Sequence, residues 1–279
     1  MIKLNNNEIN IGNFPDGTML IKQNIPEADK LTVSWFYEDD KEMIALIYLV
    51  NHLKAHGKEN VHLYMPYIPN ARQDRVKSDE DVFTLKYFAD VINSLGFKKV
   101  TVLDPHSSVS EALIDNIIIQ KPQKLIEDTI AKITEIEGEA PSMFYPDEGA
   151  GKRYSGMIPL PYAFGIKKRD WATGQIKGLD VAGDVENIEG KNILIVDDIC
   201  SKGGTFYFSA KKLKELGAKN IKEKMSISIL ENNDSSNMEI ILSDATIKGK
   251  VTAIGDDGAV INDKVYKIDD AYLEQTRTN

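Results

Sequence analysis

The sequence predicts an α/β fold with a mostly parallel sheet flanked by helices in each half of the chain. Apolar side chains recur at helical spacing over residues 41–55, and the apolar runs at 61–66 and 100–104 predict strands. In the second half, the strand-like run at 193–196 is followed by a helical pattern over 206–216. Strands that alternate with helices usually pair in parallel, because each helix returns the chain to the same end of the sheet.

Turn and cap residues separate these elements. Residues 1–22 alternate short apolar stretches with Asn-rich and Pro-Asp-Gly segments, which predicts strands joined by turns. A helix over 82–95 is expected to end at Gly96 and the last helix at Gly217, because glycine readily takes the left-handed conformation that caps a helix. A further strand is expected at the apolar stretch 225–230.

The length of 279 residues is enough for two domains. The boundary is expected near 117–123, where an apolar run meets Lys-Pro, and a helix over 123–136 would open the second half. The predicted domains are therefore residues 1–120 and 121–279.

Composition excludes several classes of protein. The 34 Lys+Arg and 43 Asp+Glu residues give a net charge of -9, which disfavours a general nucleic-acid-binding protein. One cysteine, Cys200, excludes an intrachain disulfide and is typical of a reducing compartment. The N-terminus has no apolar signal segment, and no stretch approaches the length of a membrane span. We therefore expect a soluble, cytoplasmic protein without a nucleic-acid or membrane partner.

The most informative segment is ILIVDDICSKGGT, residues 193–205. Four apolar residues are followed by Asp197 and Asp198, and a polar turn ends in Gly-Gly-Thr at the start of a predicted helix. Backbone N–H groups in such a turn attract phosphate, and aspartates at a strand's carboxyl end can bind sugar hydroxyls or magnesium. The GxxxxGK[ST] spacing of nucleotide-triphosphatase loops is missing. An ordinary buried strand with a glycine-rich turn is the alternative.

Two further segments in the first half carry candidate ligands. In YIPNARQDR, residues 67–75, Arg72 and Arg75 can bind phosphate oxygens and Gln73 can hydrogen-bond a base or sugar; a solvated, salt-bridged loop explains the segment equally well. His106 in LDPHSS follows a predicted strand end, where it can contact a metal ion or phosphate. The other histidines are interpreted as structural: His52, His56 and His62.

The second half adds two candidates. Asp147 lies in YPDEGAGKRY, residues 145–154, before glycines that permit close backbone approach to a ligand, although a turn with solvated charges is the alternative. The polar, glycine-containing segment 163–180 is interpreted as a mobile flap from which Lys167 and Arg169 neutralise a phosphate, with a plain solvated loop as the alternative.

Taken together and in this order, six strings resemble the ribose-phosphate pyrophosphokinases (phosphoribosyl pyrophosphate synthetases). They are FPDGT (14–18), YIPNARQDR (67–75), LDPH (103–106), PDEGAGKR (146–153), KKR (167–169) and VDDICSKGGT (196–205). These strings span roughly the first three-quarters of the chain.

This resemblance implies two phosphoribosyltransferase-like domains, an N-terminal ATP-binding domain and a C-terminal domain with the sugar-phosphate loop, with the active site between them. It also implies Mg²⁺-dependent transfer of the β,γ-diphosphoryl group of ATP to the anomeric hydroxyl of ribose 5-phosphate, which releases AMP. In the family, the adenine loop typically comes from a neighbouring subunit, so the resemblance implies a homo-oligomer of at least two chains.

The resemblance assigns roles to residues by position. Those implied to bind ATP are Phe14, Asp16, Thr18, Arg72 and Gln73. Those implied to hold magnesium are His106 and Asp147, and those implied to stabilise the transferring group are Lys167 and Arg169. Those implied to bind the sugar phosphate are Asp197, Asp198, Ser201, Lys202, Gly203, Gly204 and Thr205.

Two departures from the family pattern affect these expectations. Thr18 stands where the family usually has Glu in FxDGE, which weakens the adenine contact. Ser201-Lys202 stands where the family usually has Asp-Thr or Ser-Thr before Gly-Gly-Thr, and it adds a cation beside the 5-phosphate. The added charge favours, as an alternative acceptor, a larger 5-substituted ribose such as ADP-ribose, an activity that would belong to NAD salvage.

Two other functional classes share part of the pattern. A type I phosphoribosyltransferase would share the VDD loop but needs no ATP site, and an inactive regulatory homologue would bind nucleotides without turnover. The ARQDR, DPH and KKR strings argue against the first. Retention of His106, Asp147, Lys167 and Arg169 argues against the second. After about residue 230 the likeness ends, and the sequence predicts short strands around a DDG turn.

Overall fold

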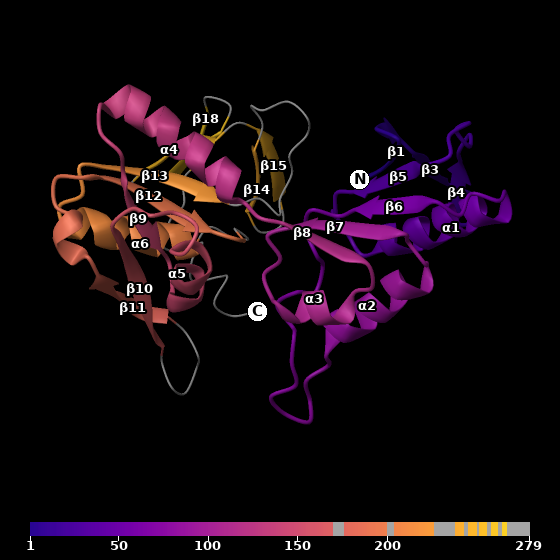
Figure 1. Cartoon of the computed structure of the whole chain (residues 1–279), viewed down its shortest axis with the longest axis horizontal. Coiled ribbons are helices and arrows are strands. Elements are labelled where there is room, and N and C mark those ends of the chain that lie inside the picture. The colour runs from indigo at the N-terminus through magenta and orange to yellow at the C-terminus, as the bar shows by residue number, and fades with distance from the viewer. Residues whose placement is uncertain are drawn as a thin grey trace. The chain divides into compact units, whose positions relative to one another are not determined.

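The computed structural model describes residues 1–169, 176–199 and 204–225 together with five C-terminal strands (Figure 1). The chain divides into two units, Met1–Lys121 and Pro122–Asn279. In the part of the chain described, no helix is long and apolar enough to cross a membrane.

The first unit contains a six-stranded sheet in the order β2-β1-β5-β6-β7-β8. Its strands are β1 (Ile2–Leu4), β2 (Asn7–Glu8), β5 (Leu31–Trp35), β6 (Val61–Tyr64), β7 (Lys99–Leu103) and β8 (Ile117–Gln120). Strands β5 to β8 pair in parallel, and β1 pairs antiparallel with β2 and β5. A separate antiparallel hairpin is formed by β3 (Asn10–Asn13) and β4 (Met19–Lys22).

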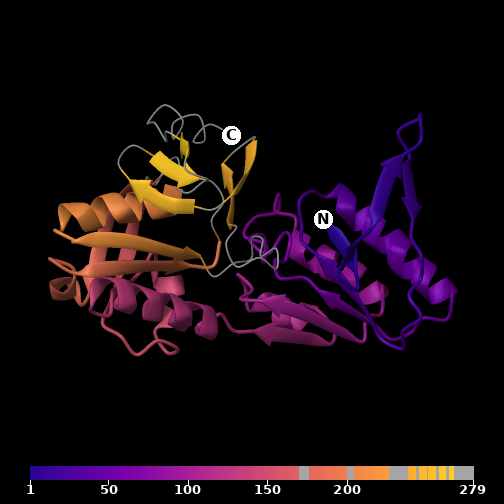
Figure 2. The same ribbon diagram turned by 90° about the horizontal axis from the view of Figure 1, so that it is seen from above.

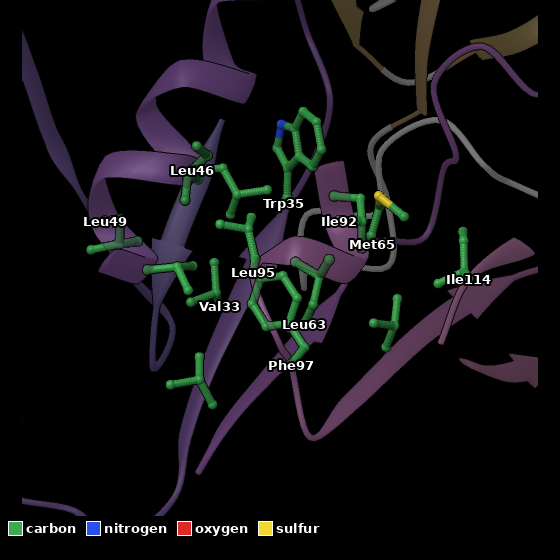
Figure 3. Close-up of a cluster of buried hydrophobic side chains, with 14 of the residues drawn as sticks. Val33, Trp35, Leu46, Leu49, Leu63, Met65, Ile92, Leu95, Phe97 and Ile114 are labelled. Atoms are coloured by element: carbon green, nitrogen blue, oxygen red, sulfur yellow. The ribbon is translucent and has the colours of Figure 1, made fainter. Parts of the chain in front are cut away.

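Three helices complete the first unit: α1 (Lys41–Ala55), α2 (Thr84–Ser94) and α3 (Val109–Leu113). The buried side chains of α1 recur every three or four residues, as the helical periodicity predicts. They pack with residues of the sheet and α2 in one apolar core (Figure 3). Trp35, which is fully buried at the end of β5, stacks on Phe88 of α2 and donates its indole N–H to Glu42 Oε2 in α1 at 2.9 Å.

The second unit contains a five-stranded sheet in the order β11-β10-β9-β12-β13. Its strands are β9 (Ser142–Tyr145), β10 (Tyr162–Arg169), β11 (Ile176–Gly183), β12 (Asn192–Asp197) and β13 (Asn220–Met225). Pairing is parallel from β10 through β9 and β12 to β13, and antiparallel between β10 and β11. The prediction of an α/β fold with mostly parallel sheets is therefore confirmed.

Helices cover both faces of this second sheet: α4 (Gln123–Glu137), α5 (Glu148–Tyr154) and α6 (Gly204–Glu215), with a short 3₁₀ turn, η1 (Val185–Asn187). Leu194 and Val196 of β12 pack on the side of α4 and α5, while Ile193 and Ile195 pack on the side of α6. Figure 2 shows α4 and α6 on opposite faces of the sheet. Burial on both faces accounts for the unbroken apolar run at residues 193–196 of β12.

Both predicted glycine caps are present. Gly96 after α2 has φ 61° and Gly217 after α6 has φ 84°. In each case the chain continues directly into the next strand, β7 or β13. Strand β13 ends at Met225, the first residue of the strand predicted at 225–230, and residues 226–230 are outside the described part.

The interpretation of residues 163–180 as a mobile flap stays a prediction, but its alternative, a plain solvated loop, is wrong for the part that the structure describes. Residues 162–169 and 176–183 are strands that pair in an antiparallel hairpin, β10 and β11. Local polarity is misleading here, because β10 is ordered by parallel pairing with β9, which is distant in sequence. Residues 170–175 are outside the described part.

The C-terminal residues form short antiparallel strands, for which we describe the backbone alone. One pair consists of β14 (Met238–Leu242) and β15 (Ala245–Gly249). A three-stranded meander consists of β16 (Val251–Gly255), β17 (Gly258–Ile261) and β18 (Lys264–Tyr266). The strands on either side of the DDG sequence therefore pair as that motif predicts.

The close packing of β10 gives a testable expectation at Gly165. A Cβ there would lie 2.6 Å from the carbonyl oxygen of Pro146 and 2.8 Å from Leu179 Cδ1. We expect Gly165→Ala to lower the free energy of unfolding by roughly 1–3 kcal/mol through overpacking. Urea unfolding followed by circular dichroism measures the loss.

The matched control is Gly178→Ala in the partner strand, where a Cβ would meet no atom within 4 Å. This substitution should change stability by less than about 0.5 kcal/mol. Equal stability of the two variants would contradict the close contact of β10 with the segment that precedes Asp147.

Candidate active site

Three neighbouring strands of the second unit carry the chemically active side chains at one edge of the sheet. Strand β9 ends two residues before Asp147, β12 ends at Asp197, and Lys167 lies near the end of β10. Because β10, β9 and β12 are parallel neighbours, their carboxyl ends meet at the same edge. Open α/β sheets usually bind their ligands there.

Asp147 and Lys167 contact each other at this edge. The Lys167 ammonium donates to Asp147 Oδ2 at 2.8 Å. The other carboxylate oxygen of Asp147 accepts the backbone N–H of Ala150 at 3.0 Å and caps the start of α5. Burial raises the pKa of Asp147, but the hydrogen bonds from Lys167 and Ala150 outweigh it, so the pKa is lowered overall. Asp147 thus begins a helix rather than lying in a turn.

Asp198 is buried and paired with a cation. Its side chain is 6% exposed, and Oδ2 accepts from an Arg153 guanidinium nitrogen at 2.5 Å. The backbone N–H of Asp198 donates to Asp197 Oδ1 at 3.0 Å. The two adjacent aspartates therefore have different surroundings, and the orientation of one carboxylate depends on the position of the other residue.

Crowding of negative charge strongly affects Asp197. Burial, together with the neighbouring charges of Asp198 and Asp147, raises the pKa of its carboxyl to about 8. Carboxylates from the ends of β9 and β12 thus interact electrostatically. A cation that entered this edge would relieve that repulsion.

The carboxylates suit magnesium in charge and ligand type. Mg²⁺ prefers oxygen ligands and is commonly held by one or two carboxylates together with substrate phosphates and water. Within the described part of the chain, no group of three or more potential ligands lies close enough to hold a metal ion by itself. The Asp147 carboxylate is an oxygen ligand of this kind, and its predicted role at magnesium stays a prediction.

In the first unit, a carboxylate joins the two loops that contain the expected nucleotide ligands. Asp74 accepts two hydrogen bonds from Arg75, at 2.7 and 3.0 Å, and one from the Ser107 hydroxyl at 2.6 Å. The hydrogen bond from Arg75 is the main reason that the pKa of Asp74 falls to about 2, and Ser107 adds to it. Loop 67–75 is thereby tied to the segment that carries His106.

The remaining expected ligands of this loop face outward. Arg72 and Gln73 are exposed, and Gln73 Oε1 accepts from the Thr84 hydroxyl at the start of α2, at 2.9 Å. His106 is partly buried, after a backbone bend in which buried Asp104 has φ 42°. All three belong to the first unit, whereas Asp147 belongs to the second.

The hairpin of β3 and β4 presents the third set of expected nucleotide ligands. Phe14 is 49% exposed at the tip. Asp16 Oδ1 accepts from both the backbone N–H and the hydroxyl of Thr18, at 3.0 and 2.7 Å, and these bonds, the hydroxyl first, lower the pKa of Asp16. Thr18 therefore orders the turn through Asp16, a role that the comparison with the family's Glu does not suggest.

Part of the predicted sugar-phosphate loop lies outside the described residues: Ser201, Lys202 and Gly203. The backbone resumes at Gly204, the first residue of α6, and Thr205 is partly buried in its first turn. Arg169 is the last residue of β10, and of it we describe the backbone alone.

Sequence reasoning did not single out Arg153, Asp74 or Ser107. Each lies within or directly beside a quoted string, but its partner is distant in sequence: Arg153 lies 45 positions from Asp198, and Ser107 lies 33 positions from Asp74. No local periodicity reports such pairs. Their position beside candidate ligands was the one available signal.

The fold and this site define a phosphoribosyltransferase-type enzyme with two domains. The family described as "N-terminal domain of ribose phosphate pyrophosphokinase" matches residues 1–96, and the family described as "Phosphoribosyl transferase domain" matches residues 156–240. A solved structure of phosphoribosylpyrophosphate synthetase from Mycobacterium smegmatis has a similar fold, with a TM-score of 0.63 at 22% identity over 77% of this chain and 71% of that one.

Curated relatives specify the family. The ribose-phosphate pyrophosphokinase of Thermococcus kodakarensis is 30% identical over 223 residues, which cover 77% of this chain and 75% of the relative. That of Saccharolobus solfataricus is 28% identical over 215 residues, which cover 75% and 72%. The chain belongs to the ribose-phosphate pyrophosphokinase family of transferases.

The loop contact at Asp74 predicts a stability loss in Ser107→Ala. Removing the hydroxyl should cost roughly 1 kcal/mol at pH 7, because Asp74 is charged and loses a buried hydrogen bond. A carboxyl with a lowered pKa adds stability above its unfolded pKa of about 4, and this is lost as the pH falls towards the folded value. The difference in stability between the variant and the wild type should therefore shrink as the pH falls below about 4, because the wild type loses more stability when Asp74 is protonated.

Urea unfolding between pH 7 and pH 3 measures this effect. The adjacent Ser108→Ala is the control, because Ser108 is exposed and its side chain makes no capping hydrogen bond to α3. If both alanine variants unfold like the wild type, Ser107 does not hold the two loops together.

The crowded carboxyl of Asp197 predicts the opposite effect, a stabilising substitution. A carboxyl whose folded pKa is raised destabilises the protein as the pH rises from its unfolded pKa, about 3.9, through the folded value of about 8. In metal-free and nucleotide-free buffer at pH 8.5, we expect Asp197→Asn to be more stable than the wild type by roughly 1–3 kcal/mol. The gain should disappear near pH 4.

Thermal unfolding across this pH range is the measurement, with Asp90→Asn on the exposed face of α2 as the control. The control should follow the wild type at every pH. A loss of stability in Asp197→Asn at pH 8.5 would show that the charged carboxylate is not under strain.

Proposed function

We propose that this enzyme transfers the β,γ-diphosphoryl group of ATP to the anomeric hydroxyl of ribose 5-phosphate, giving phosphoribosyl pyrophosphate and AMP. The anomeric oxygen forms a bond to the β-phosphorus, the bond between that phosphorus and the α,β-bridging oxygen breaks, and the hydroxyl proton passes to water. The observation that carries the proposal is the contact between Lys167 and Asp147 beside the Asp197-Asp198 pair. It is supported by the family to which the chain belongs.

Charge neutralisation is the main requirement of this reaction. Phosphoryl transfer needs alignment and positive charge more than a covalent nucleophile. Lys167 is largely buried, with 17% of its side chain exposed, so its charge is poorly screened by water. We propose that its ammonium exchanges Asp147 for oxygens of the transferring diphosphoryl group, which frees the carboxylate of Asp147 to face the metal-nucleotide.

Magnesium, bound with the nucleotide, would supply additional positive charge at the phosphates. In the second unit we assign Asp147 to it, and in the first unit His106. Asp197 and Asp198 are assigned to the sugar hydroxyls. We assign the 5-phosphate to the N-terminus of α6, with Gly204 and Thr205, because the first N–H groups of a helix have no partner within the helix and the helix dipole is positive there.

We assign ATP to the first unit, through the outward-facing Arg72 and Gln73 of the loop that Asp74 holds. The exposed ring of Phe14, with Asp16 beside it, suits adenine bound by the hairpin of a neighbouring copy, so we propose at least a dimer. Thr18 would contribute by holding Asp16 rather than by touching the base.

ADP-ribose is the alternative acceptor. It rests on Lys202, which lies outside the described residues, so ribose 5-phosphate remains the first assignment. Steady-state assays with ATP and Mg²⁺ and each sugar phosphate separately distinguish the two. Release of AMP with ADP-ribose but not with ribose 5-phosphate would replace the proposed acceptor.

Lys167→Ala tests the chemistry. Loss of one well-placed cationic donor should lower the rate of AMP formation by about 10²–10³-fold. The control is Lys191→Ala, which removes a surface ion pair to Glu139 (3.1 Å) and should leave the rate unchanged. AMP formation by Lys167→Ala at the wild-type rate would refute the role of Lys167.

A further inference from the structure

The short helix α5 links two parts of the candidate site. Asp147 caps its first turn, and Arg153, near its end, reaches the buried Asp198. A single rigid element therefore contacts both the residue that we assign to magnesium and one of the two that we assign to the sugar. Its position affects both at once.

We propose that Arg153 is a positioning residue for the sugar: its guanidinium holds Asp198, and through Asp198 it orients the carboxylate of Asp197. This proposal rests on the proposed function. In our assignment Arg153 contacts neither ATP nor the reacting atoms. Recognition of the sugar hydroxyls nevertheless depends on it.

The contact between Arg153 and Asp198 is short and shielded from water. The distance is 2.5 Å, and the two side chains are 25% and 6% exposed. The Arg153 guanidinium also lies 5.7 Å from the ring centroid of Tyr154, a fully buried residue of the second unit's core. The guanidinium thus contacts both an aromatic ring and the Asp198 carboxylate.

The effect passes from Asp198 to Asp197 through the backbone. The N–H of Asp198 donates to Asp197 Oδ1 at 3.0 Å, so a shift of Asp198 moves the donor that orients its neighbour. Removal of Arg153 would leave a buried, uncompensated carboxylate, which must move towards water or take up a proton. Either response changes the position or the charge of the carboxylates that we assign to the sugar hydroxyls.

Lysine cannot replace arginine fully at this position. A guanidinium is planar and presents several donors in a fixed geometry, whereas an ammonium is a compact, strongly hydrated charge. Arg153→Lys keeps the charge but loses the geometry, and Arg153→Gln loses both. Two variants of graded severity therefore separate the need for charge from the need for shape.

The test is steady-state kinetics with ATP, Mg²⁺ and ribose 5-phosphate. We expect Arg153→Gln to raise the KM for ribose 5-phosphate by roughly 10- to 100-fold, with a KM for ATP within about 3-fold of the wild type. Arg153→Lys should lie between the two. The control is Lys152→Gln, at the residue next to Arg153. It removes an exposed ion pair with Glu148 and should leave both KM values unchanged.

A second measurement separates positioning from a purely structural role. If Arg153 acts through Asp198, then Arg153→Gln should raise the sugar KM far less in an Asp198→Asn background than in the wild type. A structural role alone would instead lower the melting temperature and the active fraction, with both KM values unchanged.

The outcomes are distinct. An unchanged sugar KM in Arg153→Gln, or equal increases for ATP and sugar, overturns the positioning role while leaving the proposed reaction intact. A wild-type enzyme that releases no AMP with any sugar phosphate tested overturns the proposed function and this proposal with it. Additive effects of the two substitutions show that Arg153 does not act through Asp198.

Discussion

The second unit depends on the balance of charge at one edge of its sheet. Parallel pairing of β9, β10 and β12 requires their carboxyl ends to meet there, and the chain places Asp147, Asp197 and Asp198 at or just past these ends. Carboxylates so close repel one another unless cations or protons compensate them. Within the protein, Lys167 compensates the charge of Asp147 and Arg153 compensates that of Asp198.

This arrangement suits an enzyme that binds highly charged substrates. One internal cation, Lys167, pairs with a carboxylate that is 42% exposed, so a phosphate and its metal ion can replace that contact. The other, Arg153, pairs with buried Asp198 and is better suited to hold a fixed geometry. The depth of burial therefore distinguishes the two ion pairs: the more exposed pair suits exchange with a ligand, and the buried pair suits a fixed geometry.

In the first unit, a single carboxylate, that of Asp74, connects the loops that carry candidate ligands. Two of its loops carry the predicted ligands Arg72, Gln73 and His106, although exposed loops gain little from apolar burial. Asp74 connects them through Arg75 and Ser107, and the apolar core beneath is formed independently around Trp35. The contact between the loops and the apolar core beneath them are thus formed by separate sets of residues.

Sequence patterns alone determined the α/β class, the helices α1, α2, α4 and α6, the strands β6, β7 and β12, the glycine caps and the family, because these follow from local periodicity, from backbone freedom and from the order of short motifs. The roles of the site residues stay predictions. Tertiary structure decided that β10 is a strand, that Asp147 caps a helix, and that Arg153 pairs with Asp198. These contacts join segments distant along the chain, and their energies depend on burial, which no short stretch of sequence encodes.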